Sequence, residues 1–210
     1  MINIERAIVQ AWLHQSSLGE SVLDLEGMSS PKTRHLLNNL CNQASGYIEI
    51  GCWKGSTLIS AAYGNKTPIW AMDNFSEFQE KDDKDAIEKT LHKNINRLLP
   101  NRKIEFVNAD FRKILSISDF NPLNVNLCFV DGCHSEESQY DALIYLEPVL
   151  NDEFVLLVDD WNHEPARKGT MRAINDLSFK IHENYWLPAK FNGDCDLWWN
   201  GLWVARITKE

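Results

Sequence analysis

Acidic residues lie within or directly after five short apolar runs, at 47–50, 69–72, 104–109, 127–130 and 154–158. They are Glu49, Asp73, Asp110, Asp131 and the pair Asp159–Asp160. Carboxylates collected in one place can accept hydrogen bonds from hydroxyl and amine groups, and they can bind a hard divalent cation. If the runs are parallel strands of one sheet, their ends meet at one edge, and the pattern predicts a ligand site there.

The stretch "YIEIGCWKGSTL" at 47–58 places an acid and two glycines around a turn. Gly51 lets the chain bend sharply and lets a ligand lie against the backbone, while Gly55 permits close approach where a helix begins. A phosphate would use the exposed N–H groups and prefer no acid nearby, so Glu49 favours a ligand group that is cationic or donates hydrogen bonds. The alternative is an ordinary turn between a strand and a helix.

The second and third runs end in residues suited to a nucleoside. Asp73 lies 22 residues after Gly51, an offset at which a carboxylate can accept both hydroxyls of a ribose, and Asn74 adjoins it. The alternative for Asp73 is a helix cap. Asp110 can accept the exocyclic amine of an adenine, with Phe111 as an aromatic wall; core packing is the alternative for Phe111.

The fourth and fifth runs end in residues suited to a metal and a base. Asp131, Asp159 and Asp160 can converge on one hard cation, and adjacent carboxylates without a counter-charge would repel each other. The structural alternative is that Asp160 caps the helix near 165 and Asp159 bonds to the backbone. A histidine has an ordinary pKa of about 6.5, so His134 suits removal of a hydroxyl proton; the alternative is a hydrogen bond to a neighbouring glutamate.

These residues need elements that bring them together. Helix-like segments at 56–63, 82–99, 136–150 and 165–179 separate the apolar runs. Strands alternating with helices predict an α/β fold with a Rossmann-like, doubly wound sheet, mostly parallel and covered on both faces. Asn200–Gly201, between two β-rich stretches, predicts an antiparallel hairpin at the end of the chain. Helices expected at 3–16 and 31–41 form an N-terminal helical lead-in at 1–45, ahead of a cofactor-binding domain at 46–210.

The motif "EIGCWKG", the acids Asp73 and Asp110 and the C-terminal hairpin together resemble the class I S-adenosylmethionine-dependent methyltransferases. The resemblance covers most of the chain. It implies S-adenosyl-L-methionine as the cofactor, with the free amine of its methionine portion near Glu49.

The later stretches "VDGCHSEESQYDAL" and "LLVDDWN" resemble the bacterial metal-dependent sugar and small-molecule O-methyltransferases. That group implies a hydroxyl acceptor on a small molecule or saccharide. It also implies Mg²⁺ bound at Asp131, Asp159 and Asp160, and catalysis by His134 as the base with Asp131 beside it.

Three other readings remain open. A nicotinamide-dependent dehydrogenase would carry Gly-x-Gly-x-x-Gly at the first turn, and "GCWKGS" does not supply it. A non-catalytic fold relative would lack the base and the metal acids. A methyltransferase that needs no metal would work equally well with and without EDTA.

Composition limits the partners and the compartment. A net charge of −9 over 210 residues argues against nucleic acid, and no apolar run approaches the roughly 18 residues of a membrane span. Five cysteines without a CxxC pair suggest reduced thiols and a cytoplasmic protein. The tryptophan-rich tail is compatible with a homodimer. Weaker site candidates are Asn162, His163, Trp161, Trp198 and Trp199, and acceptor specificity is expected from 1–35, 75–85, 161–170 and 186–199.

Overall fold

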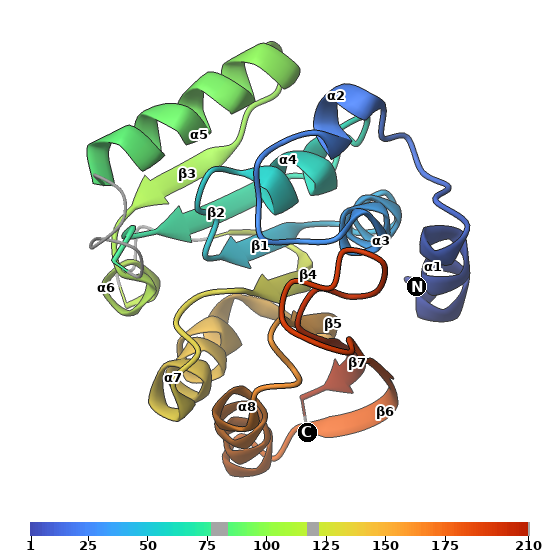
Figure 1. The fold of residues 1–210 in the computed structure, drawn as a ribbon. Helices are drawn as coiled ribbons and strands as arrows, with labels where there is room; N and C mark the ends of the chain where they lie inside the picture. Colours follow the sequence, from blue (N-terminus) through green and yellow to red (C-terminus); the bar gives the residue numbers. More distant parts are fainter. Residues whose placement is uncertain (77–83, 117–121, 210) are drawn as a thin grey trace.

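The computed structural model describes residues 1–76, 84–116 and 122–209, and within them a seven-stranded sheet lies between two layers of helices (Figure 1). The strand order is β3-β2-β1-β4-β5-β7-β6. The strands are β1 (Tyr47–Ile50), β2 (Ile69–Asp73), β3 (Glu105–Asn108), β4 (Val125–Val130), β5 (Leu150–Val158), β6 (Lys180–Leu187) and β7 (Leu202–Thr208). The predicted fold class is confirmed. Most of the charged loop predicted at 75–85, and the start of the helix predicted at 82–99, lie outside the described residues.

The first five strands run parallel, as their continuous apolar composition predicts. All four residues of β1 are buried, because helices cover both faces of the sheet. β1 pairs with β2 on one side and with β4 on the other, so the strand order reverses between β1 and β4. Ligands of open α/β sheets bind at such a reversal, beyond the carboxyl ends of the strands.

The helices divide into two layers that bury two apolar clusters (Figure 1). The layer over one face contains α1 (Ile4–Trp12), α2 (Glu20–Leu23), α3 (Pro31–Cys41), α4 (Ser56–Ala62) and α5 (Lys84–Leu98). The layer over the other contains α6 (Phe111–Leu115), α7 (Glu136–Leu146) and α8 (Glu164–Asp176), and a 3-10 turn (Glu147–Val149) joins α7 to β5. In the described part of the chain, no helix has the length and apolar character needed to cross a membrane.

The N-terminal helices begin where their caps predict. Ser30 accepts a hydrogen bond from the backbone N–H of Thr33, and Pro31 occupies the first turn of α3. Lys32 of the same helix donates to the backbone oxygen of Asp196 and lies over the ring of Trp12. These contacts fasten the N-terminal helices to the connection between the last two strands.

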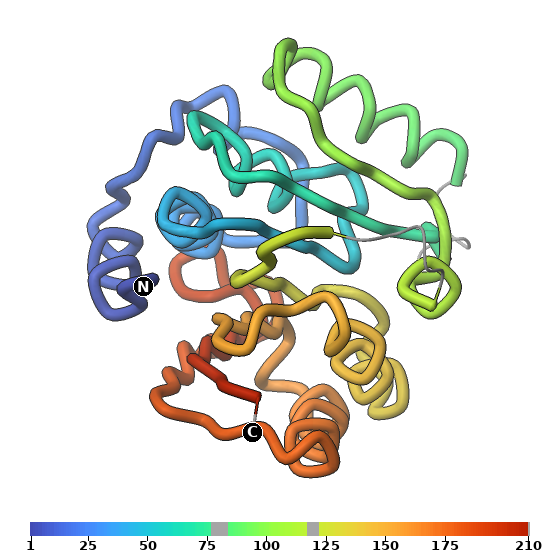
Figure 2. Tube along the Cα trace, turned by 180° about the vertical axis from the view of Figure 1, so that it is seen from behind, coloured from blue at the N-terminus to red at the C-terminus, as the bar shows by residue number. Residues whose placement is uncertain are grey.

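The predicted position of the C-terminal hairpin is wrong, although the antiparallel strands themselves are present. β7 pairs antiparallel with both β5 and β6, and β6 starts at Lys180, soon after α8 ends at Asp176. β6 alternates between exposed and half-buried residues because it forms an edge of the sheet, and this weak pattern hid it. Asn200–Gly201 therefore ends a 14-residue connection, 188–201, that follows β6. From behind, this connection lies beside the N-terminal helix (Figure 2).

Candidate active site

A cavity of about 640 Å³ opens beyond the carboxyl ends of the parallel strands. It is lined by eleven residues that the sequence singled out individually: Gly51, Asp73, Asn74, Asp110, Phe111, Asp131, His134, Asp159, Asp160, His163 and Trp199. Its size suits a ligand of nucleoside dimensions with a second small molecule beside it. Glu49 and Gly55 are not among its lining residues.

The turn after β1 depends on a glycine whose backbone touches the end of β4. Gly51 has a φ of +88°, and a Cβ placed on it would lie 2.0 Å from the backbone oxygen of Asp131. Any side chain here would combine a left-handed backbone with a collision against main chain. The glycine therefore brings two strand ends together, and a ligand can lie against that bare backbone.

Gly51→Ala is expected to lower the free energy of unfolding by about 3 kcal/mol or more, since strain and overpacking add. Urea unfolding measures the change. Gly19→Ala is the control, because no atom lies within 4 Å of its added Cβ, and its change should stay within about 1 kcal/mol. Equal effects at the two glycines would contradict the close approach of β1 and β4.

Asp73, at the end of β2, holds the turn after β1 in place. Its Oδ2 accepts hydrogen bonds from the backbone N–H groups of Cys52 at 2.7 Å and Trp53 at 2.8 Å, and its Oδ1 accepts from Phe75 at 2.7 Å. A carboxylate offers about four acceptor positions. About one position is left for a ligand hydroxyl, fewer than the two that the sequence analysis expected for a ribose.

The end of β3 supplies a charged and an aromatic wall. Asp110 caps α6 through a 2.9 Å hydrogen bond from the backbone N–H of Arg112. Phe111 is buried and packs edge-on against Tyr145, and it also lines the cavity. The guanidinium of Arg112 lies 4.5 Å from the Phe111 ring centroid and 2.6 Å from Asp141.

Glu49 lies within β1, where its side chain is fully buried. Its two oxygens accept hydrogen bonds from the hydroxyls of Tyr47 at 2.5 Å and Thr57 at 2.7 Å. Burial raises the pKa of Glu49 to about 7, although the two hydroxyls oppose that rise. The structure thus places Glu49 behind the first turn and in contact with the helix that starts there.

This raised pKa predicts a pH dependence of stability. Between the usual pKa of 4.5 and about 7, the folded chain holds a proton at Glu49 that the unfolded chain has released. Stability therefore falls as pH rises through this window, by about 3 kcal/mol in total. Glu49→Gln should remove that part of the slope, so its stability relative to the wild type should rise with pH in urea titrations. A parallel pH dependence for both proteins would contradict the assignment.

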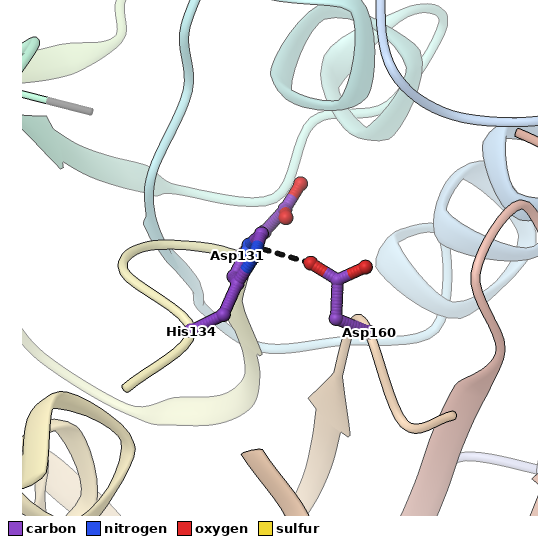
Figure 3. Close-up of side chains that lie close together, drawn as sticks. All are labelled: Asp131, His134 and Asp160. Atoms are coloured by element: carbon purple, nitrogen blue, oxygen red, sulfur yellow. Dashed lines mark ion pairs between the residues drawn. The ribbon is translucent and has the colours of Figure 1, made fainter. Parts of the chain in front are cut away.

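Three side chains from the ends of β4 and β5 converge in the cavity (Figure 3). Asp131, His134 and Asp160 each offer a ligand atom, and these atoms lie within 4.8 Å of one another. The Nε2 of His134 is 2.5 Å from the Oδ2 of Asp160. The sequence predicted Asp131, Asp159 and Asp160 as the metal group; the convergent set contains His134 beside Asp131 and Asp160, and Asp159 contacts Asp131.

The carboxylates of this cluster have strongly perturbed pKa values. Burial, followed by the charge of Asp159, raises the pKa of Asp131 well above its usual value. Burial and the neighbouring Asp160 raise the pKa of Asp159 to about 8. For Asp160 burial is the largest influence and acts in the same direction, but the hydrogen bond and charge of His134, the hydrogen bond from Asn200 and the charge of His163 together outweigh it and lower the pKa. Asp159 Oδ1 is buried and lacks a hydrogen-bond partner among the described residues.

Comparison with known proteins identifies the family of this chain. A family model described as a methyltransferase domain matches residues 48–161, which include every predicted cofactor and metal residue. The chain belongs to this methyltransferase family. It is an S-adenosylmethionine-dependent methyltransferase with the class I fold, and the dehydrogenase reading is excluded.

Solved structures share the fold of this methyltransferase. The O-methyltransferase TomG from Streptomyces achromogenes, involved in tomaymycin synthesis, matches with a TM-score of 0.62 and 14% identity over 99% of this chain and 100% of TomG. An O-methyltransferase from Bacillus cereus, in complex with SAH, gives 0.60 and 12% over 98% and 90%. TrmN from Thermus thermophilus gives 0.61 and 16% over 90% of this chain but 52% of TrmN, so this chain spans about half its length. No curated protein sequence matches.

The methyltransferase cavity also has walls that the sequence did not single out residue by residue. Met28 and Asn192 fall in the segments 1–35 and 186–199, where acceptor specificity was expected, whereas Arg112 and Asn200 lie outside the expected segments. Of the three tryptophans proposed for the pocket, only Trp199 is among the described lining residues, since Trp161 stacks on Trp203 and Trp198 packs against Trp12. Asn162 donates to the backbone oxygen of Ala189 and His163 lines the cavity. Arg112 could have been predicted, because it follows the site candidate Asp110 by two residues. Asn192 and Asn200 lie in a connection whose sequence has no periodic pattern.

Proposed function

We propose that this methyltransferase transfers a methyl group to a hydroxyl of a small molecule or sugar, with the help of a divalent metal. The observation that carries the proposal is the 2.5 Å contact between His134 and Asp160, beside Asp131, in the cavity that holds the cofactor residues. A hydroxyl is a weak nucleophile until its proton is removed, and a histidine held by a carboxylate is suited to remove it.

The cofactor would lie over β1 to β3. Gly51 offers bare backbone, Asp73 and Asn74 the ribose contacts, and Asp110 and Phe111 the adenine contacts. Glu49 would act from behind, by fixing Thr57 in the first turn of α4, while Gly55 gives that helix its left-handed start. Asp73 keeps acceptor capacity for about one hydroxyl, so a single strong ribose contact fits best.

His134 would take the proton of the acceptor hydroxyl as its oxygen bonds to the methyl carbon. The bond from that carbon to sulfur breaks at the same time, and the sulfur keeps the electron pair. Asp160 stabilises the imidazolium that results, because a carboxylate beside it favours the charged form. Holding the oxygen near the methyl supplies much of the acceleration, with effective molarities on the order of 10⁵ M or more.

The acidic cluster also fits a divalent cation. Asp131 and Asp159 have raised pKa values and Asp159 has an oxygen without a partner, so a cation here would offset the repulsion between buried carboxylates. Asp131, Asp159 and Asp160 would hold Mg²⁺ through their oxygens. Such an ion lowers the pKa of a bound hydroxyl.

The acceptor would lie against the walls that come from outside the cofactor residues. Met28 of the N-terminal lead-in, His163 before α8, and Asn192 and Trp199 of the 188–201 connection line this side. An indole ring and a carboxamide suit a compact hydroxylated molecule, since the ring offers a flat surface and the amide both donates and accepts. TomG, a structural neighbour, is involved in the synthesis of a small molecule, which supports this class.

Calorimetry and methyl transfer test the proposal together. S-adenosylhomocysteine should bind, and Mg²⁺ or Mn²⁺ should restore transfer of tritiated methyl to a panel of sugars and catechols after EDTA treatment. Transfer that EDTA leaves unchanged would favour the metal-independent alternative. Failure to bind S-adenosylhomocysteine would contradict the cofactor assignment itself.

A further inference from the structure

The turn after β5 is fastened by the last residues of the 188–201 connection. The backbone N–H of Trp161 donates to Gly201 at 2.9 Å, and the N–H of Asn162 donates to Asn200 at 3.0 Å. The side-chain amide of Asn200 donates to the Oδ1 of Asp160 at 2.5 Å. We call residues 160–162 and 200–201, joined in this way, the Asn200 clasp.

The clasp holds a backbone that is unfavourable by itself. Asp160 has a φ of +53°, a left-handed conformation uncommon for residues other than glycine. Gly201 has a φ of +86°, and a Cβ on it would lie 2.4 Å from the Oδ1 of Asn162. Such conformations persist where the surrounding contacts fix them, and they cluster at functional sites.

The two oxygens of Asp160 are engaged in opposite directions. Asn200 binds Oδ1, and His134 lies at 2.5 Å from Oδ2. Because both oxygens are held, the carboxylate plane has one orientation, and that orientation points Oδ2 at the imidazole. Without the amide, the carboxylate would be able to rotate about its last bond, and the contact with His134 would lose its direction.

We infer that Asn200 is a positioning residue, which acts through Asp160 to fix the orientation of His134. This inference rests on the proposed roles of Asp160 and His134. It assigns the 188–201 connection a part in catalysis in addition to its place in the acceptor wall. Asn200 lies far in sequence from the two stretches that contain His134 and Asp160, so only the fold brings it to these residues.

The test is the hydrogen-bonded imidazole N–H of His134 in protein labelled with ¹⁵N-histidine, observed by NMR at one neutral pH. The resonance is assigned by its absence from His134→Gln. It is expected in the wild type and in Asn162→Ala, which removes the hydrogen bond to Ala189 but leaves the amide on Asp160. It is expected to disappear from Asn200→Ala.

Asn200→Asp is the second variant, because it keeps the side-chain shape but replaces the donor by an acceptor. A resonance that persists in either folded variant would overturn the inference. If both variants lose their thermal unfolding transition, Asn200 serves stability alone, and the inference is equally overturned.

Turnover separates this inference from the proposed function. For a panel compound that the wild type methylates, Asn200→Ala should lower kcat about ten-fold, with the affinity for S-adenosylhomocysteine within about two-fold. Loss of the resonance with no methyl transfer in any protein would uphold the role of Asn200 while the proposed function fails. If the wild type transfers methyl groups but the resonance is unchanged in the folded variants, the proposed function stands and the role of Asn200 is overturned.

Discussion

His134→Gln is expected to lower methyl transfer by about 10² to 10⁴-fold, the range that a positioned general base contributes. Glutamine can still donate to Asp160 but cannot take the acceptor proton, so the shape of the site is kept and its chemistry is lost. Affinity for S-adenosylhomocysteine should stay within about two-fold, because the proposed cofactor contacts come from the ends of β1 to β3. Steady-state kinetics and calorimetry on the same preparation measure the two quantities.

The matched control is His163→Gln, since His163 also lines the cavity and its charge acts on Asp160. Its turnover should remain within a few-fold of the wild type. If His163→Gln loses turnover and His134→Gln does not, His163 is the general base in place of His134. If His134→Gln loses cofactor affinity as well as turnover, His134 is a structural residue.

Asp73→Ala is expected to weaken S-adenosylhomocysteine binding by about 100-fold or more. The substitution removes the proposed ribose contact and also leaves three backbone N–H groups without their acceptor, those of Cys52, Trp53 and Phe75. Hydrogen bonds to a charged group contribute about 1.5–3 kcal/mol each, so the loss of even one explains a large effect. Calorimetry gives the affinity, and thermal unfolding gives the cost to the fold.

Asp73→Asn separates the two roles of this carboxylate. Its carbonyl oxygen can still accept from Cys52 and Trp53, so the turn should persist, while its acceptor capacity falls. The new NH2 group faces the backbone N–H of Phe75 and cannot accept from it, so we expect an intermediate loss of affinity and a fall in unfolding temperature smaller than in Asp73→Ala. Wild-type affinity in Asp73→Ala would contradict both the ribose contact and the importance of this turn.

The sequence predicted the parallel sheet and the acids at its edge because both follow from local patterns. Continuous apolar runs identify buried strands, and the residues after them reach one edge whatever the details of packing. Glu49 shows where this reasoning ends. It belongs to the predicted motif, yet strand alternation turns its side chain toward Tyr47 and Thr57, away from the cavity lining. Whether the Glu49 side chain points into the cavity or away from it depends on the residue at which β1 ends, which the sequence pattern does not fix.

The C-terminal part was harder to predict for a different reason. Asn200–Gly201 has the composition of a two-residue hairpin turn, but its left-handed glycine serves a close contact with Asn162. Four of the eight residues of the edge strand β6 are apolar or aromatic, but they do not alternate regularly, so the hairpin partner of β7 gave no clear signal. Asn200 reaches the cavity only through this topology, and nothing local to it indicates this, whereas Trp199 was singled out as one of three candidate tryptophans.

The attachment of Lys32 and Trp12 to the 188–201 connection has a consequence for how this enzyme could be re-engineered. The family match spans 48–161, whereas Met28, Asn192 and Trp199 lie outside it. Under the proposed function, cofactor use and much of the substrate choice are encoded in separate stretches of the gene. A chimera with a foreign 188–201 segment would also need compatible α1 and α3 helices. Trp198 packs against Trp12 of α1, and the backbone oxygen of Asp196 accepts a hydrogen bond from Lys32 of α3.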